Sequence, residues 1–119
     1  MKKKVLIIED NETNMYLMKY ILRKRGCTVI GKRSGEAGIQ SALHENPDLI
    51  LMDIQLPGMD GLETTKKIRE NLSTVPIVAV TSYAMTGDRG KAIAAGCDGY
   101  TEKPINPDTF IIEIEKFIV

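Results

Sequence analysis

The sequence predicts an α/β fold of doubly wound type, in which helices cover both faces of a five-stranded parallel sheet. Two observations support this fold class. Short apolar runs alternate five times with segments that suit helices. Two of these runs end in acid, VLIIED at 5–10 and LILMD at 49–53, and a third extended segment leads into Lys103. Since parallel strands end at one edge of a sheet, these charged residues should lie near one another.

The first half of the chain should contain three strands and two helices. Apolar residues recur at helical spacing after the first strand, and Gly26 ends that helix. Asn46-Pro47 ends the second helix. The second strand contains Gly31 and Lys32, which suit the edge of a sheet. In chain order these elements span residues 5–9, 13–25, 28–32, 36–45 and 48–53.

The second half should contain three helices and two strands. Asp60-Gly61 opens the third helix, and Pro107 opens the last one. The fourth helix is the weakest because it contains Gly87 and Gly90, and an interior glycine costs about 1 kcal/mol relative to alanine. In chain order these elements span residues 60–71, 76–81, 86–95, 99–101 and 107–117.

Five such units with right-handed crossovers favour the strand order 2-1-3-4-5, with the second strand at an edge. Ligands of such sheets bind at the carboxyl ends of the strands, where the strand order reverses between strands 1 and 3. The absence of repeats, low-complexity stretches and linkers in the sequence indicates one domain over residues 1–119.

Composition excludes several classes of function. Lys+Arg and Asp+Glu number 16 each, so no excess charge favours nucleic acid or an anionic membrane. No apolar run approaches the roughly 18 residues of a membrane span, and we expect a cytoplasmic protein. Cys27 and Cys97 lack metal-type spacing and should be free, buried thiols.

The expected carboxyl edge combines acids, a hydroxyl and an ammonium. Glu9 and Asp10 follow strand 1, and Asp53, Thr81 and Lys103 stand at the ends of strands 3, 4 and 5, with Asp10 and Asp53 meeting. Two carboxylates at about 4 Å repel by roughly 4 kcal/mol at an effective dielectric near 20. Such a site needs a cation, a shifted pKa or a neighbouring lysine. Oxygen ligands suit Mg²⁺ rather than zinc, and a phosphoryl group would satisfy both the metal and the lysine.

Four segments together resemble the receiver domain of two-component response regulators. They are IIEDN at 7–11, LILMDIQLPGMDG at 49–61, VAVTSYA at 78–84 and YTEKP at 100–104. The chain looks most like stand-alone DivK-type receivers and the receivers of hybrid kinases. The resemblance covers nearly the whole chain and implies a (βα)5 flavodoxin-like fold. It also implies a signalling module that catalyses only its own phosphotransfer and dephosphorylation, rather than an enzyme.

The resemblance also implies which residues accept phosphate and bind metal. Asp53 would be the phosphoacceptor. Mg²⁺ would be held by Asp10 and Asp53, by Glu9 through water, and by the backbone carbonyl of Gln55. The pair Glu9-Asp10 departs from the commoner Asp-Asp, but a longer acid can still bind a metal-bound water.

Further roles follow from the same resemblance. Thr81 would contact a phosphoryl oxygen and Lys103 would pair with the phosphate. Tyr100 would change rotamer when Thr81 moves, and the Lys103–Pro104 peptide bond would be cis. Tyr83 would shield the phosphoryl group from water.

The implied partners are proteins. A histidine kinase or a histidine phosphotransfer protein would donate the phosphoryl group. A downstream target would bind the face of helix 4, strand 5 and helix 5, or phosphate would be relayed onward, and the chain would be a monomer or weak dimer. One alternative is a receiver trimmed from a hybrid kinase or a longer regulator. A hydrolase would need a further acid and a substrate cap, and a flavin carrier would need a phosphate-binding loop where Glu9-Asp10 stands.

Overall fold

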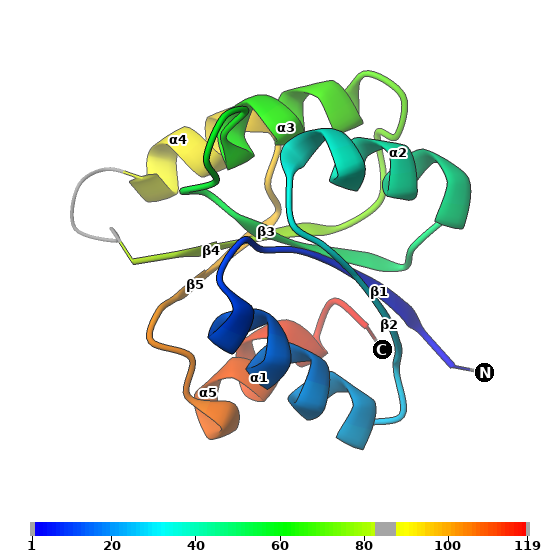
Figure 1. The fold of residues 1–119 in the computed structure, drawn as a ribbon, viewed down its shortest axis with the longest axis vertical. Coiled ribbons are helices and arrows are strands. Elements are labelled where there is room, and N and C mark those ends of the chain that lie inside the picture. Colours follow the sequence, from blue (N-terminus) through cyan, green and yellow to red (C-terminus); the bar gives the residue numbers. More distant parts are fainter. Residues whose placement is uncertain (1, 83–87, 119) are drawn as a thin grey trace.

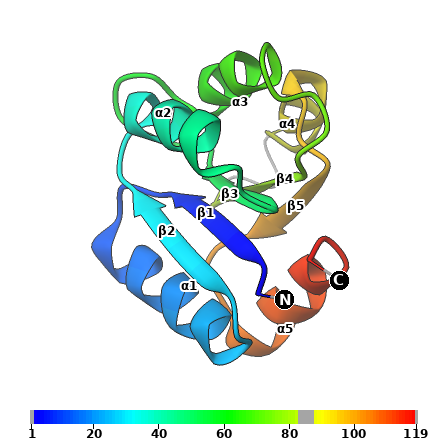
Figure 2. The same cartoon turned by 90° about the vertical axis from the view of Figure 1, so that its right-hand side faces the viewer.

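The computed structural model describes residues 2–82 and 88–118 and has the expected three-layer α/β architecture. Five parallel strands pair in the order β2-β1-β3-β4-β5, which confirms the predicted topology. Helices α1 and α5 cover one face of the sheet, and α2, α3 and α4 cover the other (Figure 1). The turned view shows the twist of the sheet, with β2 at its outer edge (Figure 2).

The elements lie close to their expected positions. The strands are β1 Lys4–Ile8, β2 Thr28–Lys32, β3 Leu49–Asp53, β4 Ile77–Thr81 and β5 Gly99–Glu102. The helices are α1 Glu12–Lys24, α2 Gly35–Glu45, α3 Gly61–Arg69, α4 Asp88–Ala95 and α5 Pro107–Glu115. The predicted start of the fourth helix at Thr86, and the glycine at position 87, lie outside the described residues.

The three central strands are buried on both faces. On β1, Val5 and Ile7 pack in a core cluster with residues of α1 and α5, whereas Leu6 and Ile8 pack with residues of α2, α3 and α4. Successive residues of β3 and β4 alternate between the same two clusters. This two-sided burial explains why these strands are continuous apolar runs. Their carboxyl ends are thereby held in fixed positions at one edge of the sheet.

Side-chain caps start the helices near that edge. The side chain of Asn11 accepts a hydrogen bond from the backbone N–H of Asn14, so α1 begins immediately after the Glu9-Asp10 pair. Asp60 caps α3 in the same way by accepting from the N–H of Glu63. None of the helices within residues 2–82 and 88–118 combines the length and apolar character that a membrane span requires.

Candidate functional site

An acidic cleft lies at the carboxyl ends of the strands. It encloses about 260 Å³ and is lined by Glu9, Asp10, Asn11, Asn14, Asp53, Gln55, Ser82 and Lys103. Its residues come from the ends of β1, β3, β4 and β5 and from the start of α1. The predicted residues at positions 9, 10, 53, 55 and 103 therefore line one cavity, although Glu9 and Lys103 are 94 positions apart in the sequence.

Lys103 lies between two buried carboxylates. Its Nζ is 3.0 Å from Glu9 Oε1 and 3.3 Å from Asp53 Oδ1. The Glu9 and Asp53 side chains are only 1% and 4% exposed, and that of Lys103 is 12% exposed. The ammonium thus offsets the repulsion between the two acids. The expected neighbouring lysine is present, and it pairs with both carboxylates.

Glu9 has a perturbed pKa. Burial disfavours its charged form and, with Asp53 beside it, raises the pKa from 4.5 to about 7. The backbone N–H of Asn11, which donates to Glu9 Oε2 at 3.1 Å, and the Lys103 ammonium both lower the pKa and so limit this rise. Adjacent carboxylates were expected to need a shifted pKa or a neighbouring lysine to reduce their repulsion. Both occur here, because the pKa of Glu9 is raised and Lys103 pairs with Glu9 and Asp53.

Asp10 lines the cleft together with Asp53, as expected, and its side chain is exposed. Glu9 is buried and makes the direct contact with Asp53. Strand β1 ends at Ile8, so the backbone turns towards α1 at this point. Arg33 Nη2 donates to the carbonyl oxygen of Asp10 at 3.0 Å and ties this turn to the end of β2. The sequence contains no pattern from which this contact of Arg33 could be predicted.

Gln55 connects the phosphoacceptor candidate to Thr81. Its backbone N–H donates to Asp53 Oδ1 at 3.0 Å. Its side-chain Nε2 donates to Thr81 Oγ1 at 2.6 Å. Thr81 ends β4 as expected, but it is fully buried and does not line the cleft. The sequence predicts a role only for the carbonyl of Gln55, and no pattern in it points to this side-chain contact.

The cleft has a donor set that fits Mg²⁺. Three carboxylates and the side chains of Asn11 and Asn14, at the start of α1, line it, and all the acidic donors are oxygen atoms. Within the described ranges, no three Asp, Glu, His or Cys side chains converge closely enough to enclose a metal ion alone. This open arrangement is compatible with Mg²⁺, because that ion usually takes one or two protein carboxylates and keeps several waters.

Two further predictions concern the chain around β5. The Lys103–Pro104 peptide bond is cis. Tyr100 is half-buried on β5, and the Arg89 guanidinium lies 6.0 Å from the centre of its ring. Tyr100, Arg89, Ile93 and Phe117 share a hollow of about 350 Å³ between α4, β5 and α5. The predicted shield at Tyr83 lies outside the described residues.

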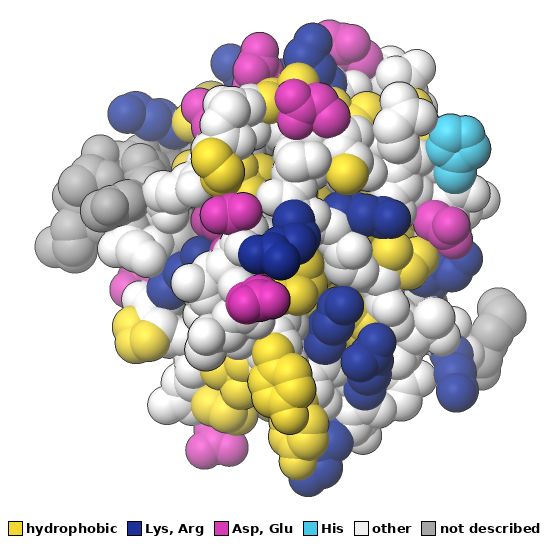
Figure 3. Space-filling model, in the orientation of Figure 1, with side chains coloured by type: hydrophobic (Ala, Val, Ile, Leu, Met, Phe, Trp, Pro, Cys, Tyr) yellow, Lys and Arg dark blue, Asp and Glu magenta, His cyan; other side chains and the backbone are white. Residues whose placement is uncertain are grey.

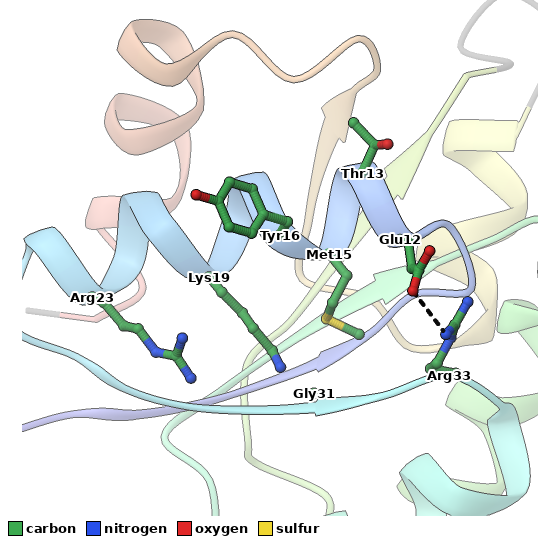
Figure 4. Close-up of a pocket in the computed structure, with 8 residues that line it drawn as sticks. All are labelled: Glu12, Thr13, Met15, Tyr16, Lys19, Arg23, Gly31 and Arg33. Atoms are coloured by element: carbon green, nitrogen blue, oxygen red, sulfur yellow. Dashed lines mark ion pairs between the residues drawn. The ribbon is translucent and has the colours of Figure 1, made fainter.

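A larger hollow of about 650 Å³ lies elsewhere, between α1 and β2. Lys19 and Arg23 extend from α1 towards β2, and Arg33 stands 3.8 Å from Glu12 at the other end (Figure 4). Figure 3 shows basic side chains gathered across the same face of the molecule, next to exposed hydrophobic ones. One acidic and three basic side chains line this groove, and it lacks the paired buried carboxylates of the acidic cleft.

Comparison with known proteins agrees with this geometry. The family model of the response regulator receiver domain matches residues 5–115. The polar-differentiation response regulator DivK of Brucella ovis is 43% identical over 120 residues, which cover 99% of this chain and 98% of the relative.

Solved receiver structures are also similar. One is the receiver domain of the sensor histidine kinase PA1611 from Pseudomonas aeruginosa PAO1, with a magnesium ion coordinated in its active site cleft. It has a TM-score of 0.90, 34% identity and 98% coverage of both chains. A CheY-like receiver domain protein from Methanospirillum hungatei JF-1 has a TM-score of 0.91 and 29% identity, with 98% of this chain and 93% of that one covered.

Proposed function

The chain belongs to the response regulator receiver family, and on this basis we propose that Asp53 accepts a phosphoryl group from a phosphohistidine donor with Mg²⁺ in the acidic cleft. The observation that carries the proposal is the placement of the Lys103 ammonium between Glu9 and Asp53. It holds a cation 3.3 Å from the carboxylate that would react, where a transferred phosphate would need one.

The residues of this chain have distinct roles in the proposed transfer. An Asp53 carboxylate oxygen attacks phosphorus, a P–O bond forms, and the P–N bond breaks with its electron pair leaving on the imidazole nitrogen. Asp10, Glu9, Asp53 and the carbonyl of Gln55 would hold Mg²⁺, which when bound neutralises charge on the phosphoryl oxygens. Lys103 pairs with the transferred group.

The proposed consequence is a change at the interaction surface. A phosphoryl group adds about −1.5 to −2 charges at neutral pH. Thr81 would move towards it and Tyr100 would follow, which alters the surface formed by α4, β5 and α5. A downstream protein would bind that surface, or a histidine phosphotransfer protein would carry the phosphate away. The proposal includes a cytoplasmic location, a single receiver domain over residues 1–119 and a monomer or weak dimer.

The two kinds of relative do not change this proposal. DivK is named as a response regulator, and the PA1611 domain is named as part of a sensor histidine kinase. The chemistry proposed for Asp53 is the same in a stand-alone regulator and in a receiver attached to a kinase. The length of the native gene product distinguishes these two settings.

Labelling with acetyl phosphate tests the phosphoacceptor. With Mg²⁺ present, the wild-type chain should gain the mass of one phosphoryl group, and the gain should disappear on chelation of the metal. Asp53→Asn should abolish the gain, since an amide is a far weaker nucleophile than a carboxylate. Asp108→Asn, at an exposed acid of α5, is the matched control and should label normally. Full labelling of Asp53→Asn would contradict the proposal.

A further inference from the structure

The side chain of Gln55 has no assigned part in phosphotransfer, yet it contacts the residue that must respond to the phosphoryl group. Its Nε2 donates to Thr81 Oγ1 at 2.6 Å. The backbone N–H of Ser82 makes a longer contact with its Oε1, at 3.4 Å. Because the amide oxygen faces an N–H, the amide nitrogen is the end that faces the Thr81 hydroxyl. One amide group therefore joins the loop after β3 to the end of β4.

This amide lies between Thr81 and the cleft. Gln55 and Ser82 line the cleft, whereas Thr81 is 0% exposed and does not line it. The same residue reaches Asp53 through its backbone, since the N–H of Gln55 donates to Asp53 Oδ1. Residue 55 thus contacts both the carboxylate that would be phosphorylated and the hydroxyl that would move towards the phosphoryl group.

We propose that the Gln55 amide is a resting-state restraint: it holds Thr81 in its unphosphorylated position, and a phosphoryl group on Asp53 competes with it for Thr81. The proposal rests on the proposed function and adds to it a positioning residue that sets how readily the domain switches. A hydrogen bond made only in the resting state stabilises that state and reduces the population of the switched state. Removing it makes the switched state easier to reach.

Gln55→Met tests the restraint, because methionine keeps a similar length and removes the amide. The probe is beryllofluoride, which mimics a phosphoryl group on a carboxylate, titrated in saturating Mg²⁺ and followed by NMR. We expect Gln55→Met to bind it about fivefold more tightly than wild type, the factor that corresponds to the ~1 kcal/mol of one neutral hydrogen bond. Unchanged or weaker binding would overturn the proposal, since weaker binding would mean that the amide supports the switched state.

The other glutamine of the chain, Gln40, provides a matched control. Gln40 is exposed on α2, and Gln40→Met should bind beryllofluoride as wild type does. In a Thr81→Val background the restraint has no hydroxyl to hold, so adding Gln55→Met should produce no further gain. A gain that persists in that background would show that residue 55 acts by another route and would refute the restraint.

A spectroscopic readout separates a restraint from a merely structural role. Without beryllofluoride, the Lys103 amide resonance of Gln55→Met should lie nearer to the position that wild type shows only when beryllofluoride is bound. The Lys103 N–H donates to the Thr81 carbonyl oxygen and makes no bond to Gln55 that the substitution would remove. A resonance that stays at the resting position, with unaltered affinity, contradicts the restraint alone. Failure of wild type to bind beryllofluoride and to be labelled by acetyl phosphate would instead contradict the proposed function.

Discussion

Glu9 is a buried carboxyl group whose pKa is raised to about 7 in the folded protein, against 4.5 in the unfolded chain. The folded state therefore binds this proton more tightly, and the stability that Glu9 contributes is present below about pH 4.5 and lost as the pH rises through about 7. We expect the unfolding free energy of the metal-free protein to fall from about pH 5 to about pH 8. Glu9→Gln should flatten this fall, as measured by urea unfolding across that range.

Glu63 provides the control for this pH dependence. It is an exposed glutamate in the first turn of α3, whereas the ion pairs of Lys103 are made with Glu9 and Asp53. Glu63→Gln should retain the wild-type slope of stability against pH. A wild-type slope in Glu9→Gln would mean that the dependence arises from a different group.

Lys103 is expected to matter more for stability than an ordinary surface lysine. Lys103→Met leaves Glu9 and Asp53 without their shared cation, and breaking a buried ion pair typically costs about 3–5 kcal/mol. The loss should be greater at about pH 8 than at about pH 5, where a protonated Glu9 removes one of the two charges. Lys4→Met breaks an exposed pair with Glu45 and should cost at most about 1 kcal/mol. Equal losses of unfolding free energy in the two variants would contradict this account.

The site residues differ in how far the sequence could predict them. Asp53, Thr81 and Lys103 could be placed because each ends or follows a strand, and strand ends converge in a parallel sheet. Asp10 lines the same cleft as Asp53, as predicted, but the direct contact of Glu9 with Asp53 depends on the direction of one backbone turn, which the sequence does not reveal. The contacts of Gln55 and Arg33 depend on side-chain conformations, for which a single sequence carries no pattern.

At the scale of the elements, the start of α3 packs tightly against the end of β3 at Gly61. A Cβ at Gly61 would lie only 2.7 Å from Ile54 Cα and would also meet the Asp53 carbonyl oxygen. Backbone atoms cannot yield as a flexible side chain can, so Gly61→Ala should lower the unfolding free energy by about 1–3 kcal/mol. It should also reduce labelling of Asp53, because the strand end has to shift. Denaturant unfolding and acetyl phosphate labelling measure the two effects.

Gly90 provides the opposite case. It is an exposed residue inside α4, and a Cβ there would meet no atom within 4 Å. Gly90→Ala should therefore raise the unfolding free energy by about 0.5–1 kcal/mol through helix propensity alone. If both alanine variants changed stability in the same direction, close approach at Gly61 would not be the cause.

The elements themselves were more predictable than their ends. The strands β1, β3 and β4 are buried on both faces, so their apolar runs identified them without reference to the rest of the chain. Where a helix boundary differs from the predicted one within the described residues, it does so by one or two residues, since caps such as Asn11 depend on local hydrogen bonds. In α3, the predicted helix continued to Asn71, whereas the structure ends it at Arg69.

At the scale of the whole molecule, the sheet separates two packed cores and leaves the acidic cleft at its edge. One core lies under α1 and α5, and the other lies under α2, α3 and α4. Residues of both clusters come from the same strands, so the strand ends that carry Glu9 and Asp53 are fixed from both sides. A ligand of the cleft that binds only this folded arrangement should therefore stabilise the entire domain.

Mg²⁺ should be such a ligand. At 100 times its dissociation constant, a ligand specific to the folded state adds about 2.7 kcal/mol of stability, so the melting temperature should rise as MgCl₂ is added. Asp10→Asn should lose most of this gain, since Asp10 is the exposed carboxylate of the cleft, whereas Asp108→Asn should keep it. Sodium chloride at matched ionic strength controls for screening of surface charges. The gain should also be smaller below about pH 7, because protons compete for Glu9. A wild-type melting temperature indifferent to Mg²⁺, or an equal gain in Asp10→Asn, would show that the acidic cleft is not where the ion binds.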